Sequence, residues 1–131
     1  PRGIEADGNL DGLYPDHLRQ SDFVVENMTI VNNAANTMDN VDRMQDVIKI
    51  RRGAKATIKN ALVKGTGGTI DLIDMSDSKG AGNAASSISI TNSLQFKTKL
   101  NGVLNTFEEA AENTGADASL FSWTGYDLSA F

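Results

Sequence analysis

Oxygen-bearing side chains alternate in a short acidic run near the start of the sequence. Asp7, Asn9 and Asp11 are separated by single residues, and a glycine follows Asp11. Alternate side chains of this kind can converge on one Ca²⁺ ion, because calcium prefers six to eight oxygen ligands. Leu18 stands where an EF-hand loop would place its bidentate glutamate, and Asp16 is a nearby substitute. The run predicts either a calcium loop or an ordinary Asx-Gly turn.

Cationic side chains form a second candidate site. Lys49, Arg51 and Arg52 lie close together in the sequence. One interpretation is that these cations contact a polysaccharide. The alternative is that they balance neighbouring acids on the surface, as most surface charges do.

A repeat indicates the elements that would position these side chains. Asparagine recurs at positions 27, 60 and 92, each time after an alternating apolar and polar run. A near-constant spacing suggests a solenoid in which each repeat is one turn of a coil. Asparagine tolerates the left-handed backbone of tight bends, and its amide can bond to the amide of the next turn. We therefore expect Asn27, Asn60 and Asn92 to form a structural ladder.

A weaker repeat lies upstream of each asparagine. It reads Ile4-Glu5-Ala6, then Ile48-Lys49-Ile50, then Ile70-Asp71-Leu72. Glu5, Lys49 and Asp71 hold the same place in it, so we expect them to stack on one face of the coil. Such a column is either a solvated charge ladder or a carbohydrate-binding face.

The patterning predicts an all-β fold. Alternation and β-branched content indicate strands at 23–32, 47–51, 56–64, 69–75 and 87–96. Two strands per repeat, with glycine-rich turns, predict about three turns of a parallel β-helix over residues 1–96. The coil is expected to be right-handed, by the usual chirality of parallel crossovers.

Residues 97–131 are expected to form a C-terminal cap of the same domain. Thr106 and Glu109 have capping-box spacing, which predicts a short helix over 107–113 closed by Gly115. Another helical turn is predicted near 38–44. Bulky apolar side chains then concentrate near the end, as a plug over the last turn or as a partner-binding patch. They are Leu120, Phe121, Trp123, Tyr126, Leu128 and Phe131.

The overall composition excludes several kinds of protein. The 131 residues carry a net charge of −5, which argues against a nucleic-acid surface. No apolar run approaches the roughly 20 residues of a membrane-spanning helix. The sequence has no cysteine, so disulfides and thiolate metal sites are absent.

The strand motifs resemble those of a known family. The runs Gly3-Ile4-Glu5-Ala6-Asp7-Gly8, Asn27-Met28-Thr29-Ile30-Val31, Ile48-Lys49-Ile50-Arg51-Arg52-Gly53 and Ile70-Asp71-Leu72-Ile73-Asp74 are similar to those of secreted bacterial right-handed β-helix proteins. The resemblance is to surface or lipoprotein-like members of the pectate-lyase-like superfamily. It implies an extracellular or cell-surface location. It also implies that the chain is the C-terminal portion of a longer coil.

Two classes of function follow as expectations. The first is a non-catalytic structural module, such as a stalk, adhesin or filament subunit, which requires no cofactor. Its uncapped N-terminal rung would stack on a second copy or on preceding turns of a longer chain. The alternative is part of a polysaccharide lyase or hydrolase, or a carbohydrate-binding coil. For a lyase, the resemblance implies that Arg51 or Arg52 acts as the base beside a calcium-bound uronate.

Overall fold

The fold is described from a computed structural model, which covers residues 2–9, 20–33, 44–67, 69–93, 106–127 and 129. Within these ranges the chain is mostly β-strand, with one short 3-10 helix. The expected all-β class is therefore confirmed. No helix among the described residues is long and apolar enough to span a membrane.

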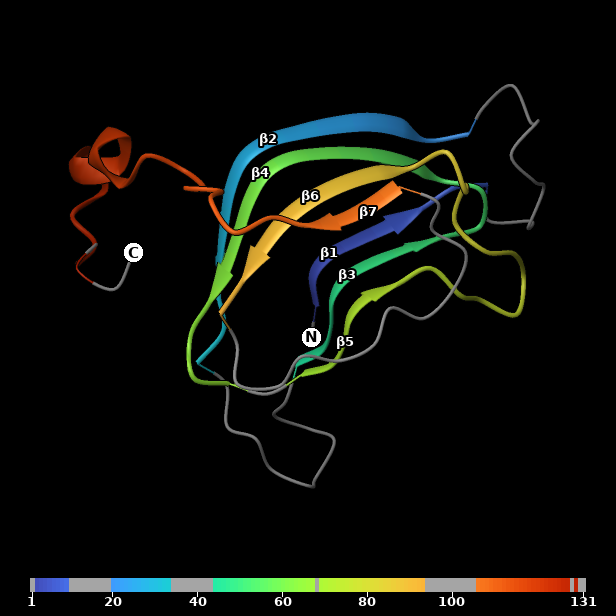
Figure 1. The fold of residues 1–131 in the computed structure, drawn as a ribbon, viewed down its shortest axis with the longest axis horizontal. Helices are drawn as coiled ribbons and strands as arrows, with labels where there is room; N and C mark the ends of the chain where they lie inside the picture. Colours follow the sequence, from blue (N-terminus) through green and yellow to red (C-terminus); the bar gives the residue numbers. More distant parts are fainter. Residues whose placement is uncertain are drawn as a thin grey trace.

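The described strands form two parallel sheets (Figure 1). The three-stranded sheet has the order β1 (Arg2–Asp7), β3 (Met44–Arg51), β5 (Thr69–Asp74). The four-stranded sheet has the order β2 (Asp22–Val31), β4 (Lys55–Lys64), β6 (Ser87–Asn92), β7 (Thr106–Glu109). From β1 to β6 the chain alternates between the sheets. We call β1 with β2 the first rung, β3 with β4 the second, and β5 with β6 the third.

Apolar side chains stack in register from rung to rung. Ile4 pairs with Ile48, which pairs in turn with Ile73. In the other sheet, Val25 pairs with Ile58, and Ile58 pairs with Ile88. These columns are part of one core cluster that contains residues of both sheets. Burial of its apolar surface is the main contribution to the stability of the fold. The cluster consists of Val47, Ile48, Ile50, Ala54, Ala56, Ile58, Ala61, Val63, Leu72, Ile73, Met75, Ile88 and Ile90.

The predicted strands are confirmed to within a few residues at most of their ends, and the weaker repeat forms strands in each copy. Its predicted register is wrong in the third copy. Lys49 pairs with Asp74, whereas Asp71 pairs with Asp46. The charged column is therefore Glu5–Lys49–Asp74, because Ile73 and not Ile70 continues the apolar column of Ile48.

The helix predicted over 107–113 is wrong. Residues Thr106–Glu109 form strand β7, which pairs in parallel with β6. The exposed backbone of β6 offers this segment hydrogen-bond partners, and that pairing overrides the local capping pattern. Strand pairing thus continues beyond the predicted boundary at residue 96. In the helical turn predicted near 38–44, Met44 begins β3 and the rest lies outside the described residues.

The tail after β7 turns back along the stack. Ala110 bonds to Ile90 of β6, Thr114 to Asn60 of β4, and Ala116 to Thr29 of β2. The tail thus crosses the outer side of the four-stranded sheet at the bend of its long strands, at the left of Figure 1. It ends in the 3-10 helix η1 (Ala118–Thr124).

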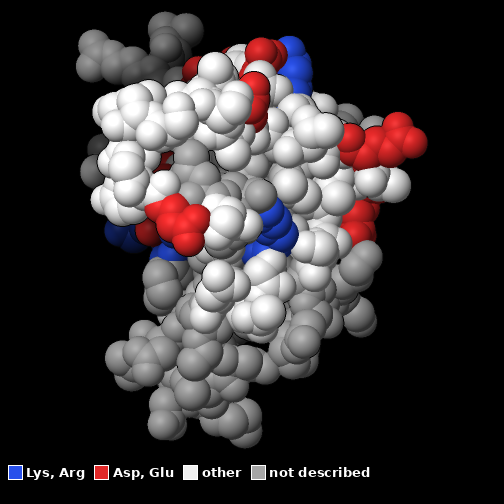
Figure 2. Space-filling view, turned by 90° about the vertical axis from the view of Figure 1, so that its left-hand side faces the viewer, with Lys and Arg blue, Asp and Glu red and all other residues white. Residues whose placement is uncertain are grey.

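The predicted plug over the last turn is therefore not what the described part of the tail forms. Trp123 and Tyr126 are 82% and 79% exposed. Leu120 and Phe121 are exposed as well, while Leu128 and Phe131 lie outside the described residues. On this side of the molecule, charged side chains are scattered among uncharged ones and do not gather into one patch (Figure 2).

Candidate functional site

The predicted calcium loop and the predicted basic cluster meet at Arg51. Its guanidinium donates to both carboxylate oxygens of Asp7. It also contacts Glu5 at 2.8 Å and Asp77 at 3.4 Å between nitrogen and oxygen. The hydrogen bond from Arg51 lowers the pKa of Asp7, against the smaller opposing effect of burial. This Arg51 cluster ties β1 and β3 to the turn that follows β5.

Packing accounts for the described part of the predicted calcium loop. The Asp7 carboxylate is already neutralised by a cation, and the main-chain N–H of Asn9 donates to Gln20 Oε1 at 2.7 Å. A side chain on Gly8 would overlap the carbonyl oxygen of Arg52, so close backbone approach explains the glycine there. Asp11 lies outside the described residues. Calcium binding by Asp7, Asn9 and Asp11 stays a prediction.

The predicted glycan-contact cations all face carboxylates of this chain. Lys49 Nζ donates to Asp74, and both side chains are only about a tenth exposed, at 9% and 11%. Arg52 Nε lies 3.3 Å from Asp77 Oδ1, and Arg51 belongs to its own cluster. Lys49 is thus a buried structural cation, which makes it a poor contact for an external polymer.

A second charged group lies at the opposite end of the same strands. Arg2 Nε donates to Asp46 Oδ2 at 2.7 Å, and Asp46 pairs in register with Asp71. Carboxylate oxygens of Asp46, Asp71 and Asp74 all lie within 4.8 Å of one another. Burial, then the neighbouring Asp74 and Asp46 charges, raise the pKa of Asp71, while Lys49 opposes them. This acidic group was missed because the register of β5 was misassigned.

Ion pairs also join the first two rungs on the four-stranded sheet. Lys55 Nζ lies 3.2 Å from Asp22 Oδ2, and Lys59 Nζ lies 2.7 Å from Glu26 Oε1. The side chains of Asp22, Glu26 and Lys59 are more than half exposed, and that of Lys55 is 37% exposed. Each acid lies on β2 and each cation on β4, in direct register.

Two members of the predicted asparagine ladder stack as expected. Asn27 and Asn60 both have left-handed backbone, with φ of 58° and 51°. Asn60 Nδ2 donates to Asn27 Oδ1 at 2.8 Å. The Asn60 amide also holds the tail, because its Oδ1 accepts from the N–H of Thr114 at 2.8 Å and its Nδ2 donates to the carbonyl of Gly115 at 3.2 Å.

Asn92 does not continue this ladder. It pairs with Val63, because Ile58 pairs with Ile88 and not with Ile90, as alignment of the two asparagines would require, and β6 then has one residue fewer than β4 between the pairs that flank Asn60. The structure instead brings in Asn113 from the tail, whose Nδ2 donates to Ser89 Oγ at 3.1 Å and to the Ala61 carbonyl at 3.3 Å. Sequence reasoning missed this role of Asn113. The available signal was an asparagine just ahead of a turn glycine.

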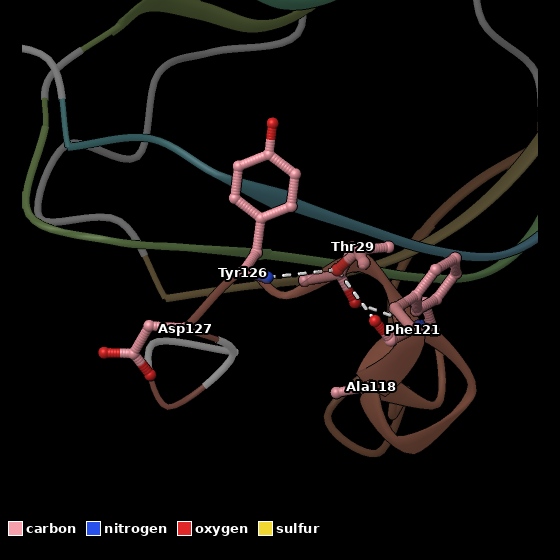
Figure 3. A pocket seen from close by; sticks show the side chains of 7 residues that line it. Thr29, Ala118, Phe121, Tyr126 and Asp127 are labelled. Carbon is pink, nitrogen blue, oxygen red and sulfur yellow. Dashed lines mark hydrogen bonds between the residues drawn. The ribbon is translucent and has the colours of Figure 1, made fainter.

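A hollow of about 450 Å³ lies between the tail and β2 (Figure 3). Phe121 and Ala118 reach it from η1, Tyr126 and Asp127 from the residues that follow, and Thr29 from β2. The Asp127 carboxylate is the one charged group among the described residues lining it. An acidic polysaccharide would therefore meet a like charge here.

In the part of the chain that the structure describes, the first rung forms an open edge of both sheets. Among the described strands, β1 and β2 each pair on one side only. Ile4 and Ala6 are half-buried, whereas their partners Ile48 and Ile50 are fully buried. Other inward-facing apolar residues of β2 are likewise only partly buried; these are Phe23, Val25, Met28 and Ile30. The edge thus presents both backbone groups and an apolar row.

Comparison with family models, with curated proteins and with solved structures finds no match to this chain.

We predict that Asp7→Asn lowers the free energy of unfolding at pH 7 by about 1–2 kcal/mol, because a charge-assisted hydrogen bond is lost. The Asp7 pKa is lowered in the folded state, so its contribution is present above about pH 4 and disappears as the pH falls through the folded-state value. Denaturant unfolding at pH 7 and pH 3 measures this. The matched control, Asp22→Asn, removes an exposed pair and should change stability by less than about 0.5 kcal/mol. Equal effects of the two substitutions would show that the Asp7–Arg51 ion pair stabilises the fold no more than an exposed pair does.

We predict that Asn60→Ala destabilises the protein by about 1–3 kcal/mol, because it forces a strained backbone and releases the tail. Asn60→Gly keeps the backbone permissive and loses only the amide bonds, so its loss should be smaller. Thermal unfolding gives both values, and limited proteolysis should cleave the tail faster in both variants. A tail as resistant as that of the wild type would show that the Asn60 amide does not hold it.

Proposed function

We propose that this chain is a segment of a right-handed parallel β-helix that serves as a structural, non-catalytic module of a secreted bacterial surface protein. Strands that alternate between two parallel sheets from β1 to β6 support the coil. The right-handed coil follows from the strong preference of parallel β-strand crossovers for right-handed connections. The proposal requires no metal ion or cofactor.

The open edge of the first rung is the observation that carries this proposal. Unpaired strand edges with an apolar row are templates for further strands, and proteins normally cover them. The second rung has a neighbouring rung on both sides, and its apolar residues in the same columns are fully buried. An added rung could bury the apolar row of the first rung in the same way. The module therefore works by accepting another rung and continuing the coil.

The charged groups give less support to a polysaccharide-cleaving or polysaccharide-binding role. Lys49, Arg51 and Arg52 are all paired with carboxylates within the chain. A cation held in this way is committed to structure, and freeing it would leave a partly buried carboxylate unpaired. The same ion pairs stabilise a stack of rungs, as the structural role requires.

The test is to add a rung and measure stability. A second copy of residues 44–69 is fused directly ahead of Pro1, so that the copy of Asp46 lies as far ahead of Arg2 as Asp46 lies ahead of Asp71. We expect the extended protein to melt about 5 °C or more above the original chain, because the added rung buries the apolar row of β1 and β2. Circular dichroism follows the transition.

The matched control carries Ile48→Asn, Ile50→Asn and Ile58→Asn within the added copy only. It has the same length but cannot pack on the edge, so its melting temperature should stay at that of the original chain. If the unaltered added rung also leaves the melting temperature unchanged, the edge does not accept rungs and the proposed function fails.

A further inference from the structure

The charged residues that pair in register between the first two rungs are arranged by sign. On the first rung, Glu5, Asp7, Asp22 and Glu26 are acidic. Their partners in register on the second rung are Lys49, Arg51, Lys55 and Lys59, all of them cations. Arg2 is the exception on the first rung, and its partner Asp46 is correspondingly acidic. Every one of these five columns therefore changes sign between the first and second rungs.

The alternation continues to the other side of the second rung. Lys49 faces Glu5 in register and makes an ion pair with Asp74 of β5. Arg51 contacts Asp7 on one side and Asp77, after β5, on the other. Lys49 and Arg51 of the second rung thus have acids on both sides. The acids of the first rung have cations on one side and the open edge on the other.

We propose that the open edge selects a β rung with a defined charge pattern, an inference that rests on the proposed function. The strand that docks on β1 carries an acid opposite Arg2 and cations opposite Glu5 and Asp7. The strand that docks on β2 carries cations opposite Asp22 and Glu26. Like charges directly opposite each other destabilise neighbouring strands, and opposite charges stabilise them. The second rung of this chain already has this pattern, in Asp46, Lys49, Arg51, Lys55 and Lys59.

The same charges disfavour head-to-tail stacking of two copies. Among the described strands, β5 is the far edge of its sheet. Stacking it on β1 of a second copy in the same register would place Asp74 in the column of Glu5. Asp71 opposite Arg2 would be the favourable contact. Asp77 would meet Asp7 in the column of Arg51. The partner is therefore a basic rung and not a second copy of this chain.

The test compares two added rungs that differ only in charge. Both are copies of residues 44–69 fused ahead of Pro1, and one carries Asp46→Lys, Lys49→Glu, Arg51→Glu, Lys55→Glu and Lys59→Glu within the copy. In 50 mM NaCl, we expect the unaltered copy to raise the melting temperature at least about twice as much as the charge-reversed copy. In 500 mM NaCl this difference should shrink, because salt screens exposed charges.

Each outcome distinguishes the two proposals. Equal stabilisation by both copies would overturn the charge rule and leave rung addition intact. Stabilisation by neither copy would remove both proposals. Sedimentation of the original chain over a concentration series tests whether a second copy binds the edge. A mass that rises with concentration to that of a stacked pair would show that it does, and would overturn the inference. We expect a constant monomer mass.

Discussion

Parallel pairing in a fixed register is the constraint on which the rest of the structure depends. Side chains alternate across a strand, so the register that stacks Ile4, Ile48 and Ile73 in the core also fixes the charges on the outer face. A slip of one residue would bury Lys49 without Asp74 and expose the isoleucines. The core and the ion pairs therefore favour the same register. A shifted register would lose both at once.

The tail depends on a local departure from that regular pairing. Asn27 and Asn60 have left-handed backbone where the long strands bend, and at this point β4 has one residue more than β6. At this bend the side-chain amide of Asn60 binds Asn27 and also holds Thr114 and Gly115 of the tail. Gly115 packs so closely on Thr29 and Leu62 that a larger residue would overlap them. The tail is thus held along the stack, and its described residues add no strand to the edge of the first rung.

The sequence predicts the strands well because alternation and β-branched residues are local signals. It also identifies Asn27 and Asn60, because a left-handed bend favours asparagine wherever the chain goes next. The sequence does not predict the register where it depends on pairing with a strand far away in the chain. Ile70-Asp71 and Ile73-Asp74 fit the repeat equally well, and only pairing with β3 selects the second.

The same limit explains the remaining differences. Asn92 matches the repeat in residue type, but Ile58 pairs with Ile88 and not with Ile90, so Asn92 lies beyond the level of Asn60. Residues 106–109 carry a helix-capping pattern that the neighbouring strand edge overrides. The ion pairs of Arg51 join residues up to 46 positions apart, so spacing alone could not show that the predicted calcium ligand Asp7 binds a cation of the same chain.

Residue-resolved amide hydrogen exchange can show whether the first rung is an open edge. In a strand paired on both sides every amide is bonded, whereas in an edge strand alternate amides face away from the neighbour. We predict slow exchange throughout the interior strand β4 and alternating slow and fast exchange along β2. Uniformly slow exchange along β2 would show instead that its outer edge is already covered and that the first rung is not open.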